Sequence, residues 1–278
     1  MRYRRVYLEI TPRCNLSCSF CVQKRIKRED LSYADFCAAV KQIAGVTDTL
    51  YYHVMGEPLL HEDLDAMMDE AWRRGLRSAI TTNGLLLGKK IGKWKDKKIS
   101  RINVSLHAYI DKDNSLSQER TLRTVEEAEI IQKETGSMVF LRLWDSDNTE
   151  QKELEKRILD RYGVLMDESV FQPNGIALSK GIRLQKDRKF VWPMDAEHGK
   201  EHGFCQGLRT HFAVLSDLTV VPCCLDAKGD LSLGNLREKP LEEILNSARA
   251  KEIYEGFSRR KTVEEICRHC EYKERFGG

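Results

Sequence analysis

Cys14-Asn15-Leu16-Ser17-Cys18-Ser19-Phe20-Cys21 places three cysteines in the spacing C-x3-C-x2-C, directly after an apolar run over residues 6–10. Three thiolates this close together can bind three corners of an iron–sulfur cube. A cubane has four irons, so one iron keeps an open position, as a catalytic metal does. The alternative is a zinc knuckle, but such sites usually use two C-x2-C pairs, and no fourth ligand lies near these three cysteines in the sequence.

This cysteine spacing resembles that of the radical S-adenosylmethionine (radical SAM) enzymes. The resemblance implies that the amino and carboxylate groups of S-adenosylmethionine chelate the open iron. An electron from the [4Fe–4S] cluster then cleaves the cofactor and leaves a 5′-deoxyadenosyl radical. Phe20 occupies the aromatic position before the third cysteine, which the resemblance places near the adenine.

Composition excludes several other classes of protein. The 278 residues have a net charge of +3, which is too small to indicate a nucleic-acid partner. No run of about 18 apolar residues predicts a membrane span, and the basic residues 2–5 are not followed by a secretory apolar core. We therefore expect a cytoplasmic protein, in which the nine cysteines are metal ligands rather than disulfides.

Strand-like and helix-like segments alternate along the first part of the chain. Predicted strands cover residues 5–10, 49–55, 77–82, 101–106, 138–143 and 169–172. Such alternation predicts an α/β fold with a parallel sheet and right-handed crossovers. Six units rather than eight indicate a partial (β/α)6 TIM-like barrel, which is the architecture of the radical SAM family. The cysteine loop leaves the carboxyl end of the first strand, where barrel enzymes place their sites.

Three domains follow from this organisation. Residues 1–175 are expected to form the barrel, 176–204 a connector that can cover the barrel mouth, and 205–278 a second unit. Within the barrel, Ser32 is predicted to cap a helix with Asp35, and Cys37 lies on the apolar face of that helix. A second helix presents one apolar face made of Leu64, Met67, Met68, Ala71 and Trp72.

Met55-Gly56-Glu57-Pro58 follows the second predicted strand and resembles the family's Gly-Gly-Glu-Pro motif, with Met in place of the first Gly. The resemblance implies that this bent backbone binds the amino group of S-adenosylmethionine. Gly56 permits close approach, Glu57 can accept a hydrogen bond from an ammonium, and Pro58 stiffens the turn. Thr82 and Asn83 belong to a Thr-Thr-Asn-Gly tetrapeptide that many members carry after strand three, although Asn-Gly is also a common turn signal.

Polar residues also end the fourth and fifth predicted strands. Ser105 matches a serine that in the family contacts the ribose or carboxylate of the cofactor, and His107 stands where Asp is usual. Arg142 is predicted to face into the barrel, where it holds a carboxylate of cofactor or substrate, or forms a structural salt bridge. His107, Arg142 and Glu9 are the candidate catalytic acid–base groups. His53 is interpreted as a hydrogen-bonded core histidine.

The most basic stretch of the chain holds Lys89, Lys90, Lys93, Lys95, Lys97 and Lys98. A solvated helix face is the default interpretation. The alternative is a docking patch for an acidic flavodoxin or ferredoxin that supplies electrons.

A second cysteine set comprises Cys205, Cys223, Cys224, Cys267 and Cys270. A β-hairpin is predicted over residues 212–221, followed by Gly-Asn-Leu and a helix with Leu241, Ile244, Leu245 and Ala248 on one face. Residues 205–273 resemble a SPASM/twitch domain. The resemblance implies one auxiliary [4Fe–4S] cluster bound by Cys205, Cys223, Cys267 and Cys270, with Cys224 pointing the other way. A zinc ion held by the same four thiolates is the alternative.

A cluster whose four irons all have protein ligands can accept an electron from a substrate radical. We therefore expect an oxidoreductase that dehydrogenates an alcohol or forms a C–S, C–C or C–O bond. The cysteine arrangement resembles that of aminocyclitol dehydrogenases, whereas the wider SPASM branch modifies peptides; a chain that starts at strand one slightly favours a small-molecule, sugar-like substrate. The alternatives are a redox-neutral epimerase or rearrangement enzyme, and a non-enzymatic zinc-binding interaction protein.

Overall fold

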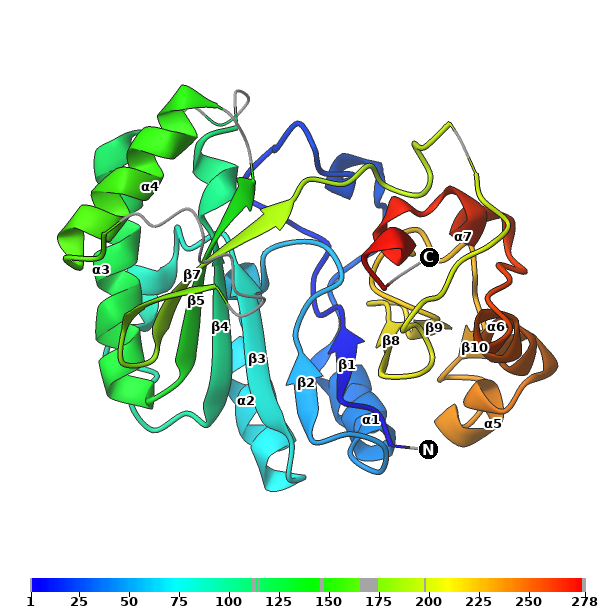
Figure 1. Cartoon of the computed structure of the whole chain (residues 1–278). Coiled ribbons are helices and arrows are strands. Elements are labelled where there is room, and N and C mark those ends of the chain that lie inside the picture. The colour runs from blue at the N-terminus through cyan, green and yellow to red at the C-terminus, as the bar shows by residue number, and fades with distance from the viewer. Residues whose placement is uncertain are drawn as a thin grey trace.

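The computed structural model describes residues 2–111, 114, 116–145, 148–165, 175–197 and 199–276. Its strands join one sheet in the order β10-β9-β8-β1-β2-β3-β4-β5-β7-β6 (Figure 1). The strands are β1 (Arg5–Leu8), β2 (Thr49–Tyr51), β3 (Arg77–Thr82), β4 (Ile99–Ser105), β5 (Met138–Asp145), β6 (Ile176–Ser179), β7 (Ile182–Arg188), β8 (His211–Val214), β9 (Thr219–Val221) and β10 (Gly234–Asn235).

Six of these strands, β1 to β5 and β7, run parallel to one another. Residues of one parity, such as Val6 and Leu141, are buried in the main apolar core against the helices. Residues of the other parity line the concave face of the sheet, because side chains alternate along a strand. This α/β architecture confirms the predicted TIM-like partial barrel with a C-terminal unit.

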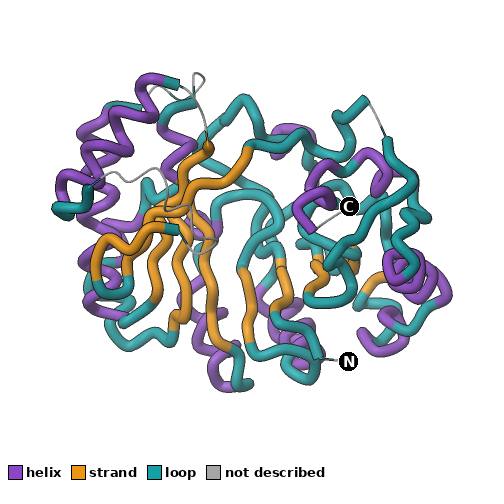
Figure 2. Tube along the Cα trace, viewed as in Figure 1, coloured by secondary structure: helices purple, strands orange, loops and turns teal. Residues whose placement is uncertain are grey.

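Four helices cover the convex face of the barrel sheet (Figure 2). They are α1 (Tyr33–Ile43), α2 (Leu64–Arg73), α3 (Gln118–Thr135) and α4 (Thr149–Arg161). The predicted cap of α1 is confirmed, since the Ser32 hydroxyl accepts from the Asp35 N–H. The predicted apolar face of α2 is buried except for Trp72, which is 49% exposed and was wrongly assigned to the core.

The lysine-rich stretch does not form the expected helix face. It contains the 3-10 helix η3 (Leu87–Lys90) and turns. The amines of Lys90 and Lys97 pair with Asp65 and Asp69 of α2, at N–O distances of 3.0 and 2.6 Å. These two lysines therefore tie the stretch to the neighbouring helix rather than project into solvent.

The sixth barrel strand differs from the prediction. The expected strand at 169–172 lies outside the described residues, and the sixth parallel strand is β7, which pairs with β5 and forms a hairpin with β6. Both strands lie in the segment predicted to be a connector, so that assignment is wrong for residues 176–188. Lys186 occupies a helix-facing position of β7 and pairs with Glu155 of α4 at 3.0 Å. This charged residue hides the apolar alternation on which the prediction depended.

The C-terminal unit extends the same sheet, because β8 lies parallel to β1 and pairs with β9 in the predicted hairpin. Its helices are α5 (Leu241–Leu245), α6 (Ala248–Ser258), α7 (Glu265–His269) and the 3-10 helix η5 (Glu271–Phe276). The single helix predicted over 241–248 is interrupted before Ser247, whose hydroxyl accepts from Ala250 N–H and begins α6. In the described residues, no helix has both the length and the apolar character needed to cross a bilayer.

Candidate active site and iron–sulfur centres

The first three cysteines lie in the loop that follows β1, at the carboxyl edge of the barrel sheet (Figure 1). The Cys21 N–H donates to the Cys18 carbonyl at 3.1 Å, and the Leu16 N–H donates to Cys14 Sγ at 3.5 Å. These bonds turn the loop back on itself. Burial raises the pKa of Cys18 to about 11 and the pKa values of Cys14 and Cys21 above their usual value. Thiols with raised pKa values become thiolates when a metal replaces the proton.

Asn83, predicted from the tetrapeptide, contacts the cysteine loop directly. Its side-chain amide donates to Asn15 Oδ1 at 2.8 Å and approaches Cys14 Sγ at 3.9 Å. The end of β3 thus lies against the first of the three thiols.

Asn114 is a site residue that sequence reasoning missed. Its Nδ2 donates to Cys18 Sγ at 3.1 Å, and its Oδ1 accepts from the Ser17 N–H at 3.1 Å. Asp111 supports the same loop by accepting from the Ser19 N–H and hydroxyl at 3.0 and 2.6 Å. The available signal was the polar run after the fourth strand, at the same sheet edge as the cysteines.

Gly56 brings the second motif against the backbone just before Cys14. Its φ is +76°, and a Cβ there would lie 2.2 Å from the Thr11 carbonyl oxygen and 2.8 Å from that of Arg13. The following Glu57 N–H donates to the same Arg13 oxygen at 2.7 Å. Only glycine permits this approach to the backbone of residues 11–13.

The Glu57 carboxylate is fully enclosed by donors of the chain itself. It accepts from Thr82 Oγ1 at 2.7 Å, Asn83 N–H at 2.7 Å and Leu59 N–H at 3.0 Å. Burial raises the pKa of Glu57 to about 7 despite these hydrogen bonds. This side chain joins the ends of β2 and β3 and begins the 3-10 helix η2 (Pro58–Leu60). It is a positioning residue, because its carboxylate accepts from donors of the chain itself.

Glu9 is not available as a general base. Its buried carboxylate pairs with the Arg28 guanidinium at 2.8 Å and accepts from Met55 N–H and the Ser216 hydroxyl, both at 3.1 Å. Arg28 also donates to the Ala227 carbonyl at 2.9 Å. The pair therefore connects β1, the Met-Gly-Glu-Pro turn and the C-terminal unit.

His107 and Arg142 lie next to each other inside the barrel. His107 Nδ1 lies 3.3 Å from the Arg142 carbonyl oxygen, which can only accept a hydrogen bond, so Nδ1 carries the hydrogen. Burial and the Arg142 guanidinium lower the pKa of His107 to about 3, which keeps the imidazole neutral. Ser105 is paired in register with Arg142 on the neighbouring strand.

The Arg142 guanidinium itself faces Asp187 on β7, with an Nη2–Oδ2 distance of 3.6 Å. Arg275 of η5 also pairs with Asp187, so two cations share one carboxylate. A guanidinium has five N–H donors and no acceptor atom, so Arg142 is suited to hold a carboxylate rather than to act as a base. His53 is only half-buried, and its Nδ1 has no hydrogen-bond partner in the described structure, so the prediction of a hydrogen-bonded core histidine is wrong.

A series of ring contacts joins the first cysteine loop to the C-terminus. Phe20 lies 5.6 Å from Trp144 between ring centroids, and its carbonyl accepts from Trp192 Nε1 at 2.8 Å. Phe190 contacts both Trp192 and Tyr272, at 5.4 and 5.8 Å. Part of the predicted connector thus lies between the two cysteine sets, a placement that sequence alone did not give.

The second cysteine set surrounds one cavity. Cys205, Cys223, Cys267 and Cys270 line it with apolar neighbours that include Leu225, Phe257 and Ile266. Cys224 does not line this cavity; it packs in a separate buried cluster with Tyr7, where burial raises its pKa to about 11. Among the residues that the structure describes, no group of three or more His, Cys, Asp or Glu side chains is arranged to hold a single metal ion.

Two family models match the chain. A model described as the radical SAM superfamily matches residues 8–140, and an iron–sulfur cluster-binding domain called SPASM matches residues 205–271. The chain belongs to the radical SAM superfamily, in its SPASM-domain branch. The first match includes the three-cysteine loop, and the second begins at Cys205 and includes Cys270.

Curated relatives of this radical SAM protein include proteins named GTP 3′,8-cyclase. That of Aliarcobacter butzleri is 32% identical over 148 residues, which are 49% of this chain and 43% of that protein. That of Staphylococcus aureus strain JH9 is 31% identical over 141 residues, 47% of this chain and 41% of the relative. The chain therefore matches less than half the length of these relatives.

Solved structures similar to this radical SAM protein extend over nearly the whole chain. BtrN in complex with AdoMet and 2-DOIA has a TM-score of 0.58 at 15% identity, covering 98% of this chain and 94% of that one. AnSMEcpe with bound AdoMet has a TM-score of 0.62 at 16% identity, covering 96% of this chain and 86% of that one. Streptococcus suis SuiB bound to S-adenosylmethionine has a TM-score of 0.65 at 15% identity, covering 97% of this chain and 71% of that one. At this identity, the similarity establishes the fold.

The cofactors of this radical SAM protein are [4Fe–4S] clusters and S-adenosylmethionine, and its thiols suit them. Three thiols on one loop, two of them approached by amide donors, leave one corner of a cube open. Four thiols line one apolar cavity, and four thiolates are the number that a second cube with no open iron would need. We propose that the first set holds the S-adenosylmethionine cluster and the second set holds the auxiliary cluster.

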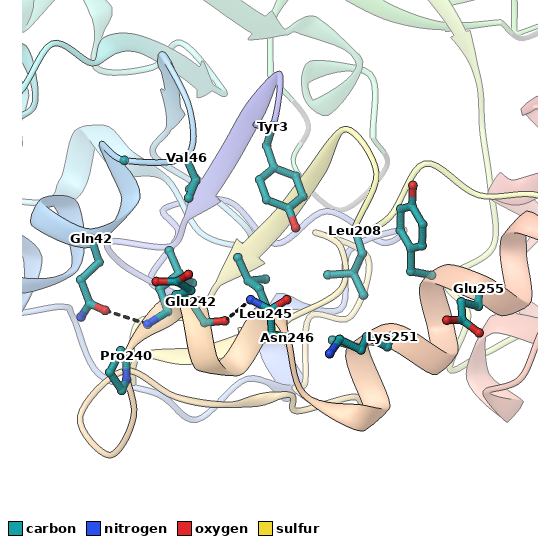
Figure 3. A pocket seen from close by; sticks show the side chains of 14 residues that line it. Tyr3, Gln42, Val46, Leu208, Pro240, Glu242, Leu245, Asn246, Lys251 and Glu255 are labelled. Carbon is teal, nitrogen blue, oxygen red and sulfur yellow. Dashed lines mark hydrogen bonds between the residues drawn. The ribbon is translucent and has the colours of Figure 1, made fainter. Parts of the chain in front are cut away.

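A large pocket lies away from both cysteine sets. Its volume is about 690 Å³, and Figure 3 shows Tyr3 at the start of the chain and Leu208, Leu245 and Lys251 of the C-terminal unit around it. Gln42 of α1 closes one side by accepting from the Leu241 N–H at 2.7 Å. This pocket is near the amino edge of β1, whereas the reactive groups are at the carboxyl edge.

Proposed function

We propose that this radical SAM protein is an oxidoreductase that removes a hydrogen atom from an unactivated C–H bond and two electrons in total from its substrate. The bound first cluster and S-adenosylmethionine supply the 5′-deoxyadenosyl radical that takes the hydrogen atom. The observation that supports oxidation is the four-thiol cavity, because a saturated cluster has no iron free for substrate and is suited to accept an electron.

The proposed reaction balances without another oxidant. The substrate loses one hydrogen atom to the radical, then one electron to the auxiliary cluster and one proton to a base. The electron that cleaves S-adenosylmethionine would come from the first cluster, and the electron held by the auxiliary cluster would return to it. S-Adenosylmethionine would then be the net oxidant and yield methionine and 5′-deoxyadenosine, and the product would be two hydrogens lighter than the substrate.

The substrate is proposed to lie between the two cysteine sets. This region is bordered by the rings of Phe20, Trp144 and Tyr272 and by Arg142 with its partner Asp187. The aromatic rings exclude water, and Arg142 orients a polar substrate group or the cofactor carboxylate. His107 is neutral and presents its unprotonated Nε2 as a hydrogen-bond acceptor for a substrate hydroxyl.

Phe20, the Met55–Pro58 turn, Thr82, Asn83 and Ser105 are proposed to bind S-adenosylmethionine. They come from different segments at the carboxyl edge of the sheet, and Glu57 holds two of those segments together. An acidic flavodoxin or ferredoxin is the proposed electron donor, and the exposed Lys93, Lys95 and Lys98 are its proposed docking surface.

The substrate is proposed to be an aminocyclitol-like small molecule or a peptide. BtrN, bound to 2-DOIA, and SuiB, whose structure has been solved with the precursor peptide SuiA, are similar in fold, and fold alone does not choose between these substrates. A redox-neutral reaction is the second candidate, because the curated relatives are named GTP 3′,8-cyclase.

The decisive experiment is anaerobic turnover of the reconstituted protein with dithionite and S-adenosylmethionine. 5′-Deoxyadenosine and products are followed by mass spectrometry with 2-DOIA, GTP or a peptide as probe substrates. A product lighter by two hydrogens supports oxidation, whereas an isomer of the substrate supports the redox-neutral candidate. Iron and sulfide analysis tests the third possibility: zinc without labile sulfide contradicts both enzyme proposals and supports an interaction module.

A further inference from the structure

Lys273 is a buried cation next to the auxiliary cysteines. It lies in η5, three residues after Cys270, and is only 4% exposed. Its Nζ donates to the Cys267 carbonyl at 3.0 Å and to the Arg268 carbonyl. Both acceptors are neutral, and no carboxylate of the described residues pairs with it; the adjacent Glu274 pairs instead with Lys200.

The Lys273 side chain separates the four-thiol cavity from solvent. It lines that cavity on one side. On the other side it lines an open pocket of about 760 Å³, together with Lys200, Glu201, His202, Gly203, Arg260 and Glu274. A Cβ at Gly203 would lie 2.8 Å from Lys273 Cδ, so the glycine leaves room for the lysine stem.

This position matters because four thiolates give a [4Fe–4S] cluster a net negative charge, and reduction adds one more. A fixed positive charge in a water-poor setting favours the more negative state. Hydrogen bonds, net charge and solvent exposure are the factors by which a protein sets a cluster potential. Lys273 changes the local charge and closes the site to water.

We propose that Lys273 is the charge-compensating residue of the auxiliary cluster and raises its reduction potential, which suits the cluster to accept an electron from substrate. This inference rests on the proposed auxiliary cluster at Cys205, Cys223, Cys267 and Cys270. Lys273 acts on the cluster and does not contact substrate, so it is a positioning and tuning residue.

The test is a redox titration of the full-length holoenzyme, monitored by EPR. The auxiliary signal is identified as the one that S-adenosylmethionine leaves unchanged. Lys273→Met is expected to disfavour reduction about tenfold, which is a potential lower by ~59 mV for one electron. Lys273→Arg keeps the charge, and its equilibrium constant for reduction of the auxiliary cluster should stay within about twofold of the wild-type value.

Two further variants separate charge from structure. Lys200→Met removes an exposed charge on the other side of the same pocket, and its potential should match wild type, because solvent screens that charge. Lys273→Gln keeps a donor for the Cys267 carbonyl but removes the charge. If Lys273→Met loses iron, the potential of Lys273→Gln tests the effect of the charge instead.

The inference is overturned if Lys273→Gln holds both clusters and the auxiliary cluster keeps its wild-type reduction potential. It is also overturned if Lys273→Gln and Lys273→Arg shift that potential equally, because a charge-conserving variant that shifts the potential as much shows a structural effect. Failure of the proposed function is a different result: the wild-type protein then contains one cluster, or zinc, at the second cysteine set. Two clusters with no charge effect leave the proposed function intact and reject only the role of Lys273.

Discussion

The two cysteine sets are built in different ways. The first is three thiols on one short loop, and the polar side chains of Asn83 and Asn114 approach it from neighbouring strand ends. The second is four thiols from three separate segments around an apolar cavity, closed by the buried Lys273. The difference indicates that the first site is arranged to admit a ligand, whereas the second is arranged to hold charge away from water.

The largest expected effect comes from breaking the first set. Cys18→Ala should abolish 5′-deoxyadenosine formation completely, because two thiols do not hold the cube that binds the cofactor. The variant should lose roughly half of its iron and keep the auxiliary signal in EPR. Continued cleavage of S-adenosylmethionine would show that the chemistry does not depend on this loop.

The next effect distinguishes two adjacent cysteines. Cys223 lines the four-thiol cavity and Cys224 packs with Tyr7, so Cys223→Ala should lose roughly half the iron and the oxidised product while still forming 5′-deoxyadenosine. Cys224→Ala is the matched control and should keep both clusters. The opposite pattern would move the fourth auxiliary ligand to Cys224.

Gly56→Ala tests how closely the second motif must approach the first loop. The added Cβ would lie 2.2 Å from the Thr11 oxygen, and we expect about 3 kcal/mol of destabilisation. That corresponds to a melting temperature lower by roughly 6–12 °C, measured by calorimetry, with weakened S-adenosylmethionine binding.

Gly92→Ala is the control for backbone conformation alone. Gly92 has a similar φ of +77°, and a Cβ added there would have no neighbouring atom within 4 Å. This variant should cost about 1 kcal/mol. Equal losses in the two variants would mean that the contact at Gly56 does not matter.

Asn114→Ala removes the donor that lies 3.1 Å from Cys18 Sγ. Residues that bond to metal ligands typically change activity by about 10-fold or more, and loss of a hydrogen bond to sulfur should lower the potential of the first cluster. EPR titration should show this shift with the auxiliary potential unchanged. Asn246→Ala, at the end of α5, is the remote control.

The smallest expected effect concerns electron delivery. Reversing Lys93, Lys95 and Lys98 to Glu should slow reduction by flavodoxin roughly threefold to tenfold at low salt and leave reduction by dithionite unchanged. Stopped-flow absorbance measures both rates. An unchanged flavodoxin rate, with an unchanged salt dependence, would remove this surface as the docking site.

The elements that sequence predicted well have strong local signals. The strand at 77–82 matches β3, and Ser32 begins α1 with the expected hydrogen bond, because alternation and capping depend on neighbouring residues. β7 was missed because a paired lysine occupies a position that is usually apolar. The exposure of Trp72 was missed because Trp72 continues the apolar spacing of α2 although its side chain is not buried. The helix break at Ser247 was missed because the apolar spacing continues across it from α5 into α6.

The sequence by itself determined the chemistry that depends on short spacing. Cys14, Cys18 and Cys21 lie within eight residues, so the covalent chain alone holds their thiols near one another. The order of the two cysteine sets likewise established the SPASM branch of the family.

Only the tertiary structure decided what surrounds those thiols. Asn114 meets Cys18 across 96 positions of the sequence, and Arg28 meets the Ala227 carbonyl across 199. Contacts between distant segments have no local pattern, because they arise from the packing of the sheet and its loops. The exclusion of Glu9 as a base and the placement of Lys273 at the auxiliary cavity both follow from that packing.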